Sequence, residues 1–286
     1  MTVFNRNNNL LSNYKKDIQF FDSPFPHIII ENCLHQDDYD KMKYSFPEES
    51  VFLNSGQKVN SSLSTIKFFD MLNNKEISSV NPIFFDFFNY HTSYEFLFEV
   101  VKIFNAEVNK RGVKYKEIYE MSKFKDYEDL KKYLEVVNIS KKSPSINTNH
   151  SPLKNSSIRG VHLDRSKNIF GALFYFKDDI DKDNGGDLEL YSWKNKLDFY
   201  KKFYFSDPVD VKHVNLVKNI KYDANKIVIF LNSIDSLHAV TDRKINAPIR
   251  KYLYLSSDSV NTDVVNKSNI VTKICHKLQN IFTKFS

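Results

Sequence analysis

The sequence predicts a mostly β protein with flanking helices, of the α+β class, and three observations support this. Short segments rich in β-branched and aromatic residues, separated by turn residues, follow one another after residue 155. Aromatic residues between positions 82 and 104 recur at the three- and four-residue spacing of buried helices. The tail, residues 264–285, gathers its apolar residues on one helical face. With 41% hydrophobic and 15% aromatic residues in 286, the chain can bury a substantial core.

The N-terminal part is expected to be mainly helical. Its first elements are, in order, a polar arm or a short helix ending near Phe21 (residues 1–22), a strand (28–30), a helix (36–46) and a loop (54–64). Two prolines lead into the strand, because the residue before a proline favours an extended backbone. Pro47 ends the helix, since proline cannot continue it.

Two buried helices, broken near residues 91–93, are predicted over residues 82–104. His91 lies beside this apolar stretch, where a core or capping histidine is more common than a metal ligand. Residues 106–142 are richly charged and contain a candidate solvated helix at 127–137. The Ser, Asn and Pro residues of 143–155 indicate a loop.

Seven strands are predicted in the C-terminal half, which is typical of a barrel or a jelly roll. They cover residues 158–163, 169–176, 188–193, 209–217, 226–231, 237–241 and 251–256. The acidic run 179–187 resembles a calcium loop but lacks the glycine and the bidentate glutamate of one, so a hairpin turn is predicted there. The tail helix is expected to dock on its own barrel or on a second subunit, as in a homodimer, rather than on a membrane.

Composition excludes several classes of function. The net charge of +6 arises from 41 basic and 35 acidic residues that are mixed along the chain, so no nucleic-acid partner is expected. The two cysteines, Cys33 and Cys275, form no C-x-x-C pair, which argues against a disulfide scaffold and a thiolate zinc site. No signal peptide or membrane span is evident, so a soluble cytoplasmic protein is expected. Nucleotide-binding, zincin and serine-hydrolase motifs are absent.

One pattern indicates a metal site. His162 and Asp164 are two residues apart in an extended segment, and alternate strand residues point to the same side. His238 follows 74 residues after Asp164, just beyond an apolar strand. Two imidazoles and one carboxylate form the facial triad that suits non-haem Fe(II) and leaves adjacent coordination positions open for a cosubstrate and O2.

A basic residue follows the second histidine at the start of the last strand. Arg250 lies 12 residues after His238. A dicarboxylate cosubstrate such as 2-oxoglutarate needs a fixed cation, and the planar guanidinium of arginine matches a carboxylate. The neighbouring Lys251 would point to the opposite face of the strand.

These residues carry a resemblance to a known family. The strings SSIRGVHLD, GALFYF, GGDLELYSWK, YDANKIVIFLNS, SLHAVT and APIRKYLYL occur in this order. They resemble the 2-oxoglutarate- and Fe(II)-dependent oxygenase superfamily, in its prolyl-4-hydroxylase-like bacterial branch, well over residues 156–256 and loosely over 24–46. The resemblance implies a double-stranded β-helix of the jelly-roll or cupin-like kind, with His162, Asp164 and His238 as ligands and Arg250 on the far carboxylate of 2-oxoglutarate.

The resemblance also suggests further cosubstrate contacts. Arg159, which precedes the H-x-D, is expected near the site or in a salt bridge at a strand edge. Relatives are expected to place a tyrosine hydroxyl on the cosubstrate where Phe174 falls here, while the adjacent Tyr175, the other candidate contact, should face away. Asn232 is a polar candidate near the metal or a simple turn residue.

We therefore expect one oxygenase domain over residues 1–286. Residues 1–150 would form the helical part and substrate cover, 151–258 the catalytic core, and 259–286 the amphipathic helix. Its expected reaction hydroxylates a C–H bond of a small molecule or peptide, with 2-oxoglutarate and O2 converted to succinate and CO2. A metal-binding cupin-like sensor or ligand-binding protein, and a zinc-dependent hydrolase or isomerase, are the alternatives; the substrate itself is not indicated.

Overall fold

The structure, a computed structural model, describes thirteen parts of the chain. They are residues 3–12, 18–54, 63–73, 80–110, 123–126, 128–129, 131–132, 139–140, 144–149, 160–165, 168–182, 184–195 and 208–259. Several expected features lie outside them: Arg159, the C-terminal helix at 264–285, Cys275 and most of the candidate helix at 127–137.

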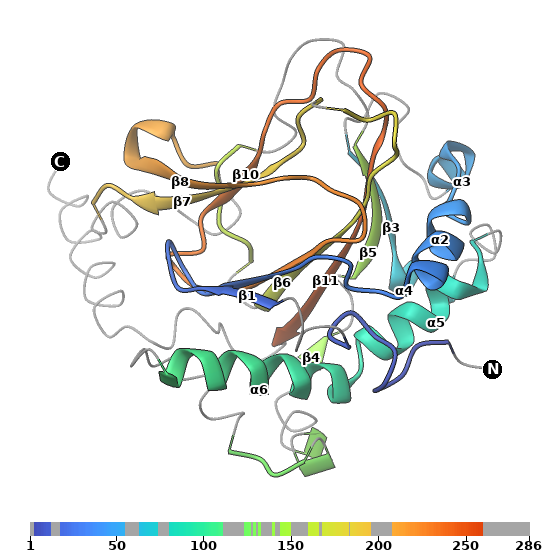
Figure 1. The fold of residues 1–286 in the computed structure, drawn as a ribbon, viewed down its shortest axis with the longest axis horizontal. Coiled ribbons are helices and arrows are strands. Elements are labelled where there is room, and N and C mark those ends of the chain that lie inside the picture. The colour runs from blue at the N-terminus through green and yellow to red at the C-terminus, as the bar shows by residue number, and fades with distance from the viewer. Residues whose placement is uncertain are drawn as a thin grey trace, which may run out of the picture.

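The N-terminal half contains both helices and strands, and strands dominate the C-terminal half (Figure 1). The helices are α2 (Gln36–Tyr44), α3 (Glu49–Asn54), α4 (Phe68–Asn73), α5 (Pro82–His91), α6 (Tyr94–Lys110) and the 3-10 turn η2 (Val211–His213). The strands are β1 (Ile18–Phe21), β2 (His27–Ile30), β3 (Leu63–Lys67), β4 (Ile139–Ser140), β5 (Ser145–Asn149), β6 (Asn168–Phe176), β7 (Leu188–Trp193), β8 (Val214–Ile220), β9 (Ile227–Leu231), β10 (His238–Val240) and β11 (Arg250–Ser259).

The larger of two antiparallel sheets has the strand order β1-β2-β9-β6-β11-β5-β3, with β4 paired to one end of β11. Its central strand β6 is buried along its whole length, which fits a strand covered on both faces. In the β11 register, Arg250 pairs with Asn149 and Tyr254 with Ser145. The order therefore places β3 and β5, from the N-terminal half, beside the last strand of the C-terminal half.

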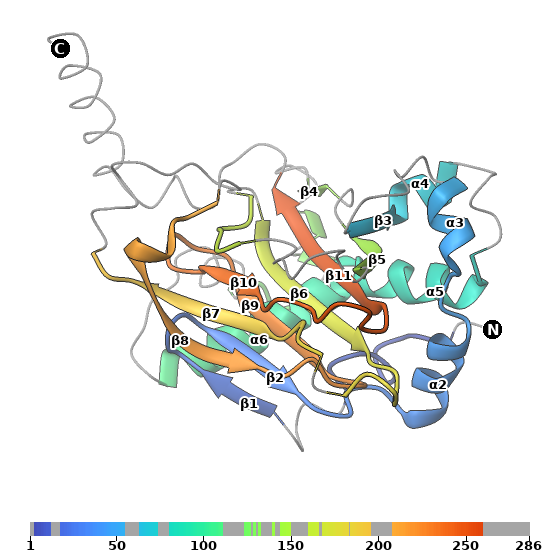
Figure 2. The same ribbon diagram turned by 90° about the horizontal axis from the view of Figure 1, so that it is seen from above.

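The smaller sheet, β10-β7-β8, packs against one face of the larger one. An apolar cluster joins the two sheets, with Leu188 and Leu190 of β7 against Leu173 of β6 and Phe230 of β9. Figure 2 shows β7 and β10 beside β6 and β9 from a second direction. The mostly β class with two antiparallel sheets and a few helices is confirmed.

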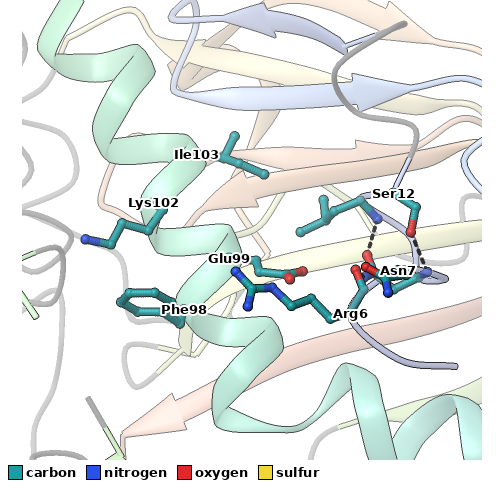
Figure 3. A pocket seen from close by; sticks show the side chains of 9 residues that line it. Arg6, Asn7, Ser12, Phe98, Glu99, Lys102 and Ile103 are labelled. Carbon is teal, nitrogen blue, oxygen red and sulfur yellow. Dashed lines mark hydrogen bonds between the residues drawn. The ribbon is translucent and has the colours of Figure 1, made fainter. Parts of the chain in front are cut away.

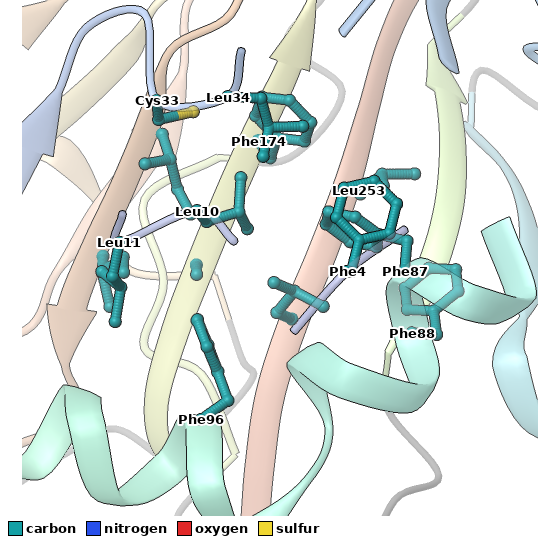
Figure 4. Close-up of a cluster of buried hydrophobic side chains, with 14 of the residues drawn as sticks. Phe4, Leu10, Leu11, Cys33, Leu34, Phe87, Phe88, Phe96, Phe174 and Leu253 are labelled. Atoms are coloured by element: carbon teal, nitrogen blue, oxygen red, sulfur yellow. The ribbon is translucent and has the colours of Figure 1, made fainter. Parts of the chain in front are cut away.

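The helices cover the opposite face of the large sheet (Figures 1 and 4). The main core lies between them, where Phe87 and Phe88 of α5 and Phe96 of α6 meet apolar side chains of β6 and β11 such as Phe174 and Leu253. The predicted break between the two helices is confirmed, since α5 ends at His91 and α6 begins at Tyr94. His91 is a buried core residue, as predicted. Its Nδ1 lies 2.7 Å from the carbonyl oxygen of Phe87, and its Nε2 accepts a hydrogen bond from the Leu10 backbone at 3.1 Å.

Three predicted elements were wrong. The end of the N-terminal arm is the strand β1, paired with β2, rather than a helix. The expected loop at 143–155 contains β5, a strand between β11 and β3. The run 179–187 is no hairpin turn, because β6 and β7 belong to different sheets and the run crosses between them. The second and third errors concern strand pairings between segments that are distant in sequence, which local patterns do not report.

Among the described residues, none of the helices is both long enough and apolar enough to cross a bilayer. The strand predicted at 209–217 begins later, at Val214, because the Asp210 side chain caps the turn η2 by accepting a hydrogen bond from the Lys212 backbone.

Candidate metal centre

The three predicted ligands meet at one point between the sheets. His162 and His238 form an isolated antiparallel bridge, in which each backbone N–H donates to the carbonyl of the other residue, at 3.0 and 3.1 Å. Asp164 Oδ1 lies 3.7 Å from His162 Nε2 and 3.8 Å from His238 Nε2. Ligand atoms of all three residues lie within 4.8 Å of one another, and all three side chains are buried. A single cation in the centre would be within reach of all three.

Both imidazoles are held in the orientation that a metal requires. His162 Nδ1 lies 2.8 Å from the carbonyl oxygen of Gly160, and His238 Nδ1 lies 2.9 Å from that of Ser236. A carbonyl oxygen only accepts, so each Nδ1 carries the proton and each Nε2 presents its lone pair. Metal-binding histidines are typically oriented in this way by a hydrogen bond from the other ring nitrogen.

The carboxylate of Asp164 is positioned from β11. Tyr254 donates its hydroxyl hydrogen to Asp164 Oδ2 at 3.0 Å, and Asn168 Nδ2 donates to the same hydroxyl at 2.8 Å. Gly171 of β6 leaves room for this carboxylate, since a Cβ there would lie 3.2 Å from Oδ2 and 2.6 Å from the Phe230 ring. The sequence analysis missed Tyr254, although its alternate spacing with Arg250 along the last strand was a usable signal.

Arg250 lies at the start of β11 and is almost fully buried. Its Nε donates to the Gly186 carbonyl at 2.8 Å and its Nη1 to Asn149 Oδ1 at 2.9 Å. Its Nη2 is buried and has no hydrogen-bond partner among the described residues. A buried guanidinium with one unused donor group is costly unless an acceptor completes it, so the site fits an anionic group at this point.

Tyr175 lies on the same side as Arg250, with Tyr222 and Tyr252 also near the guanidinium, which corrects the predicted orientation of Tyr175. Its ring centroid lies 5.1 Å from the Arg250 guanidinium carbon, whereas Phe174 packs into the core under the helices. Burial raises the pKa of Tyr175 to about 12, and the charge of Arg250 opposes that rise. The Tyr175 hydroxyl is buried and, like Arg250 Nη2, has no hydrogen-bond partner within the part of the chain that the structure describes. The structure thus places the Tyr175 hydroxyl beside Arg250, although the sequence predicted that this candidate contact would face away.

A second buried arginine binds the turn that also binds Arg250. Arg243 forms a bidentate pair with Asp181, at 3.2 and 2.9 Å, and donates to the carbonyls of Gly185 and Pro248. Gly185 and Gly186 both have positive φ angles, of 77° and 88°, which glycine adopts without strain. This pairing holds the turn whose carbonyl binds Arg250, and the sequence analysis did not single out Arg243.

The other predicted residues have structural contacts. Asn232 Nδ2 donates to the carbonyls of Arg165 and Asn168, and its Oδ1 accepts from Ser236 Oγ, so the side chain ties together the loops that carry the ligands. Lys251 points to the opposite face from Arg250, as predicted, and its Nζ pairs with Asp178 at 3.0 Å.

A cavity of about 560 Å³ contains the three ligands and Arg250. Its walls come from both sheets and include β3 and β5, where Leu63, Thr65 and Lys67 face Ser145, Asn147 and Asn149. The two imidazole nitrogens and single carboxylate oxygen suit Fe(II), and the unused donors of Arg250 and Tyr175 suit a carboxylate. The residues present therefore fit both an iron ion and 2-oxoglutarate.

A second cavity, of about 460 Å³, lies between the N-terminal arm and α6 (Figure 3). Arg6 and Glu99 face each other there. Burial raises the pKa of Glu99 to about 7. Within the described residues, the group that could hold a metal ion is the His162, Asp164 and His238 set, so the chemistry points to the first cavity.

Fold and site together define a candidate mononuclear metal centre of the two-histidine, one-carboxylate kind, built between two antiparallel sheets. No family model and no curated protein matches the sequence. Solved structures similar to the chain include prolyl 4-hydroxylases and other 2-oxoglutarate- and Fe(II)-dependent oxygenases, bacterial ones among them.

Three of these similarities illustrate the level of agreement. A prolyl 4-hydroxylase structure from Phytophthora capsici is 11% identical over 83% of this chain and 60% of its own, with a TM-score of 0.37. A Trichoplax adhaerens prolyl hydroxylase, in complex with a hypoxia inducible factor peptide, is 12% identical over 87% of each chain, with a TM-score of 0.40. HygX from Streptomyces hygroscopicus, with nickel and 2-oxoglutarate bound, is 9% identical over 82% of this chain and 83% of its own, with a TM-score of 0.38. At such similarity, the chain's own residues must carry any assignment of function.

Proposed function

We propose that this protein is a 2-oxoglutarate- and Fe(II)-dependent dioxygenase that hydroxylates a C–H bond of its substrate and releases succinate and CO2. The observation that carries the proposal is one cavity that is lined by both the metal triad and Arg250, whose buried Nη2 has no hydrogen-bond partner among the described residues. The Tyr175 hydroxyl, also without a partner there, lies buried beside this arginine. A metal site alone needs only the triad. The buried guanidinium would in addition be completed by an anionic group of a ligand.

The separation of the two features suits a short dicarboxylate. Arg250 and Tyr254 lie on one strand four residues apart, so their Cα atoms are about 13 Å apart. The Tyr254 hydroxyl contacts Asp164, so Tyr254 marks the metal end of this span. The Arg250 side chain shortens the distance between the guanidinium and the triad from the other end. We infer that 2-oxoglutarate lies along β11, with its distal carboxylate on Arg250 and Tyr175.

The protein's own residues would hold and orient the reactants. His162, Asp164 and His238 would hold the iron, which supplies the oxidising chemistry with O2 when 2-oxoglutarate is bound. Three protein ligands leave the remaining coordination positions to the cosubstrate and O2. The buried walls would exclude water, and the fixed hydrogen bonds of the two imidazoles would keep the ligands in place without rearrangement.

We further propose that the two sheets form a double-stranded β-helix within a single oxygenase domain. Two antiparallel sheets packed face to face with a site between them support this topology. Residues before 151 would do more than cover the substrate, because β5 supplies Asn149 to Arg250.

Anaerobic titration tests the proposal directly. Addition of Fe(II) and 2-oxoglutarate should produce a weak visible charge-transfer band, and Arg250→Ala should abolish it. Lys251→Ala is the matched control, since this neighbour faces away from the cavity and pairs with Asp178. No band in folded, iron-loaded wild-type protein would contradict the proposal.

The same measurement separates the alternatives. A metal-binding sensor or a zinc-dependent hydrolase needs the triad but not the Arg250 and Tyr175 donors. Such a protein would bind metal without changing its affinity when 2-oxoglutarate is added, and Arg250→Ala would leave metal binding and activity intact.

A further inference from the structure

Two basic side chains line the metal-centre cavity besides Arg250. Lys67 ends β3, and Arg165 directly follows the ligand Asp164. Both are exposed. Neither makes an ion pair with an acidic residue in the described part of the chain. An unpaired cation at the wall of a cavity is available to a ligand.

The net charge of the cavity indicates what kind of ligand these two cations would bind. Asp164 is the one acidic residue among the described residues of its lining, and Arg250 balances it. An iron ion of charge +2 and a doubly negative 2-oxoglutarate would also cancel each other. The charges of Lys67 and Arg165 would then remain uncompensated in the loaded site, which favours a negatively charged partner.

Strand register places Lys67 at the metal end of the cavity. Lys67 pairs with Ser145 of β5, and Ser145 pairs with Tyr254 of β11, whose hydroxyl contacts Asp164. Two strand spacings separate Lys67 from Tyr254, about 10 Å between Cα atoms, a gap that a lysine side chain partly spans. Figure 1 shows β3, β5 and β11 side by side in this order. The wall facing the cosubstrate thus carries a cation at the level of the metal.

The wall between these points is polar. The hydroxyl of Thr65 donates to Asn147 Oδ1 at 2.9 Å, and Asn147 Nδ2 donates to Ser145 Oγ at 3.0 Å. Such side chains accommodate hydroxyl and amide groups of a ligand better than a hydrocarbon surface.

We propose that the substrate is a polar small molecule with an anionic group, a phosphate or a carboxylate, that Lys67 and Arg165 bind. This inference rests on the proposed dioxygenase function and names the class of substrate for the same site. Binding of the anion at the metal end would hold the rest of the molecule, and the C–H bond to be hydroxylated, beside the three ligands.

Small anions serve as probes of this site. The protein is loaded with substoichiometric Mn(II), which is paramagnetic, and with saturating 2-oxoglutarate. Methyl phosphate and 13C-labelled acetate are then titrated at constant ionic strength, and broadening of their 31P and 13C NMR lines measures binding close to the metal. The variants are Lys67→Gln, Arg165→Gln and the double change, and Lys41→Gln removes an equal charge from α2, where the lysine pairs with Asp38.

We expect wild-type protein and Lys41→Gln to broaden the lines of at least one anion at millimolar concentration. Each change in the cavity should weaken binding about tenfold, because a charge-assisted hydrogen bond is lost. Arg165→Lys should restore part of the affinity. Stronger binding of methyl phosphate than of acetate would identify a phosphate ester, and the reverse order a carboxylate.

Three results would overturn the inference while leaving the proposed function intact: no broadening in loaded wild-type protein, equal broadening in the double variant, or a loss of 2-oxoglutarate affinity in the variants, which would assign the cations to the cosubstrate. Failure of wild-type protein to bind the metal or 2-oxoglutarate would instead remove the proposed function and this inference with it.

Discussion

Gly186 and Arg250 are fitted to each other at the cosubstrate end of the cavity. The Gly186 carbonyl accepts a hydrogen bond from Arg250 Nε at 2.8 Å, and a Cβ at Gly186 would lie 2.8 Å from Arg250 Cδ. The absence of a side chain at one position thus determines the path of the other across the cavity wall.

Gly186→Ala should therefore displace Arg250. Because the guanidinium would no longer be oriented to bind a carboxylate, we expect the affinity for 2-oxoglutarate to fall about 10- to 100-fold. The affinity for the metal should be unchanged. The dependence of the charge-transfer band on 2-oxoglutarate concentration measures this. Gly160→Ala is the matched control, since a Cβ there would meet no atom of the described residues within 4 Å. Equal losses in both variants would contradict the explanation.

Tyr254→Phe should weaken metal binding. The change removes the hydroxyl that donates to Asp164 Oδ2, and loss of such an outer hydrogen bond typically lowers metal affinity about 10- to 100-fold. Competition with a chelator of known affinity gives the value. Tyr44→Phe, at a residue 85% exposed, should leave it unchanged. Unaltered affinity in Tyr254→Phe would show that Asp164 keeps its position without this tyrosine.

Arg243→Met should destabilise the fold. The change leaves the carboxylate of Asp181, which is 1% exposed, buried without its bidentate partner. Removing one member of a buried pair costs about 3–5 kcal/mol. The double change Asp181→Leu with Arg243→Met should recover much of the loss, since no unpaired charge remains. Urea denaturation gives the free energy of unfolding of the wild-type protein, the single variant and the double variant. A double variant as unstable as the single one would argue against the loss of the ion pair as the cause.

The buried His91 predicts a loss of stability in acid. Burial lowers the pKa of its imidazole to about 3, against about 6.5 in the unfolded chain. Between these values the unfolded state binds a proton that the folded state does not, so stability is present above pH 6.5 and falls as the pH decreases. From pH 7 to pH 5 the loss from this group is about 2 kcal/mol.

His91→Gln tests this assignment. The variant lacks the titrating ring, so its stability difference from wild-type protein should narrow by about 2 kcal/mol between pH 7 and pH 5. Free energies of unfolding in urea at the two pH values give the comparison. Parallel pH dependence of the two proteins would place the acid sensitivity elsewhere.

Local spacing was sufficient for several features of the site. Residues two apart on an extended chain share a side, and this predicted that His162 and Asp164 act together and that Arg250 and Lys251 diverge. The strands that flank these residues were visible as β-rich runs between turn residues. The break between α5 and α6 followed from aromatic spacing and the polar residues after Tyr90.

The orientation of β6 could not be read in the same way. All nine of its residues are buried, so polar and apolar residues do not alternate and the sequence does not mark which side faces the site. The prediction that Phe174 faces the site and Tyr175 faces away was therefore wrong, because the sequence does not show the neighbouring strands. Packing of Phe174 under α5 and of Tyr175 beside Arg250 settles the orientation.

By itself, then, the sequence determined the mostly β class, the ligand-type residues and the sides on which His162, Asp164, Arg250 and Lys251 lie, because these depend on contacts a few residues apart. Only the tertiary structure decided that β5 pairs with β11, that Asn149 meets Arg250 and that Lys67 lies in register with Tyr254 across β5. Such pairings join residues that are about a hundred positions apart. They arise from burial of whole sheet faces, which no local pattern encodes.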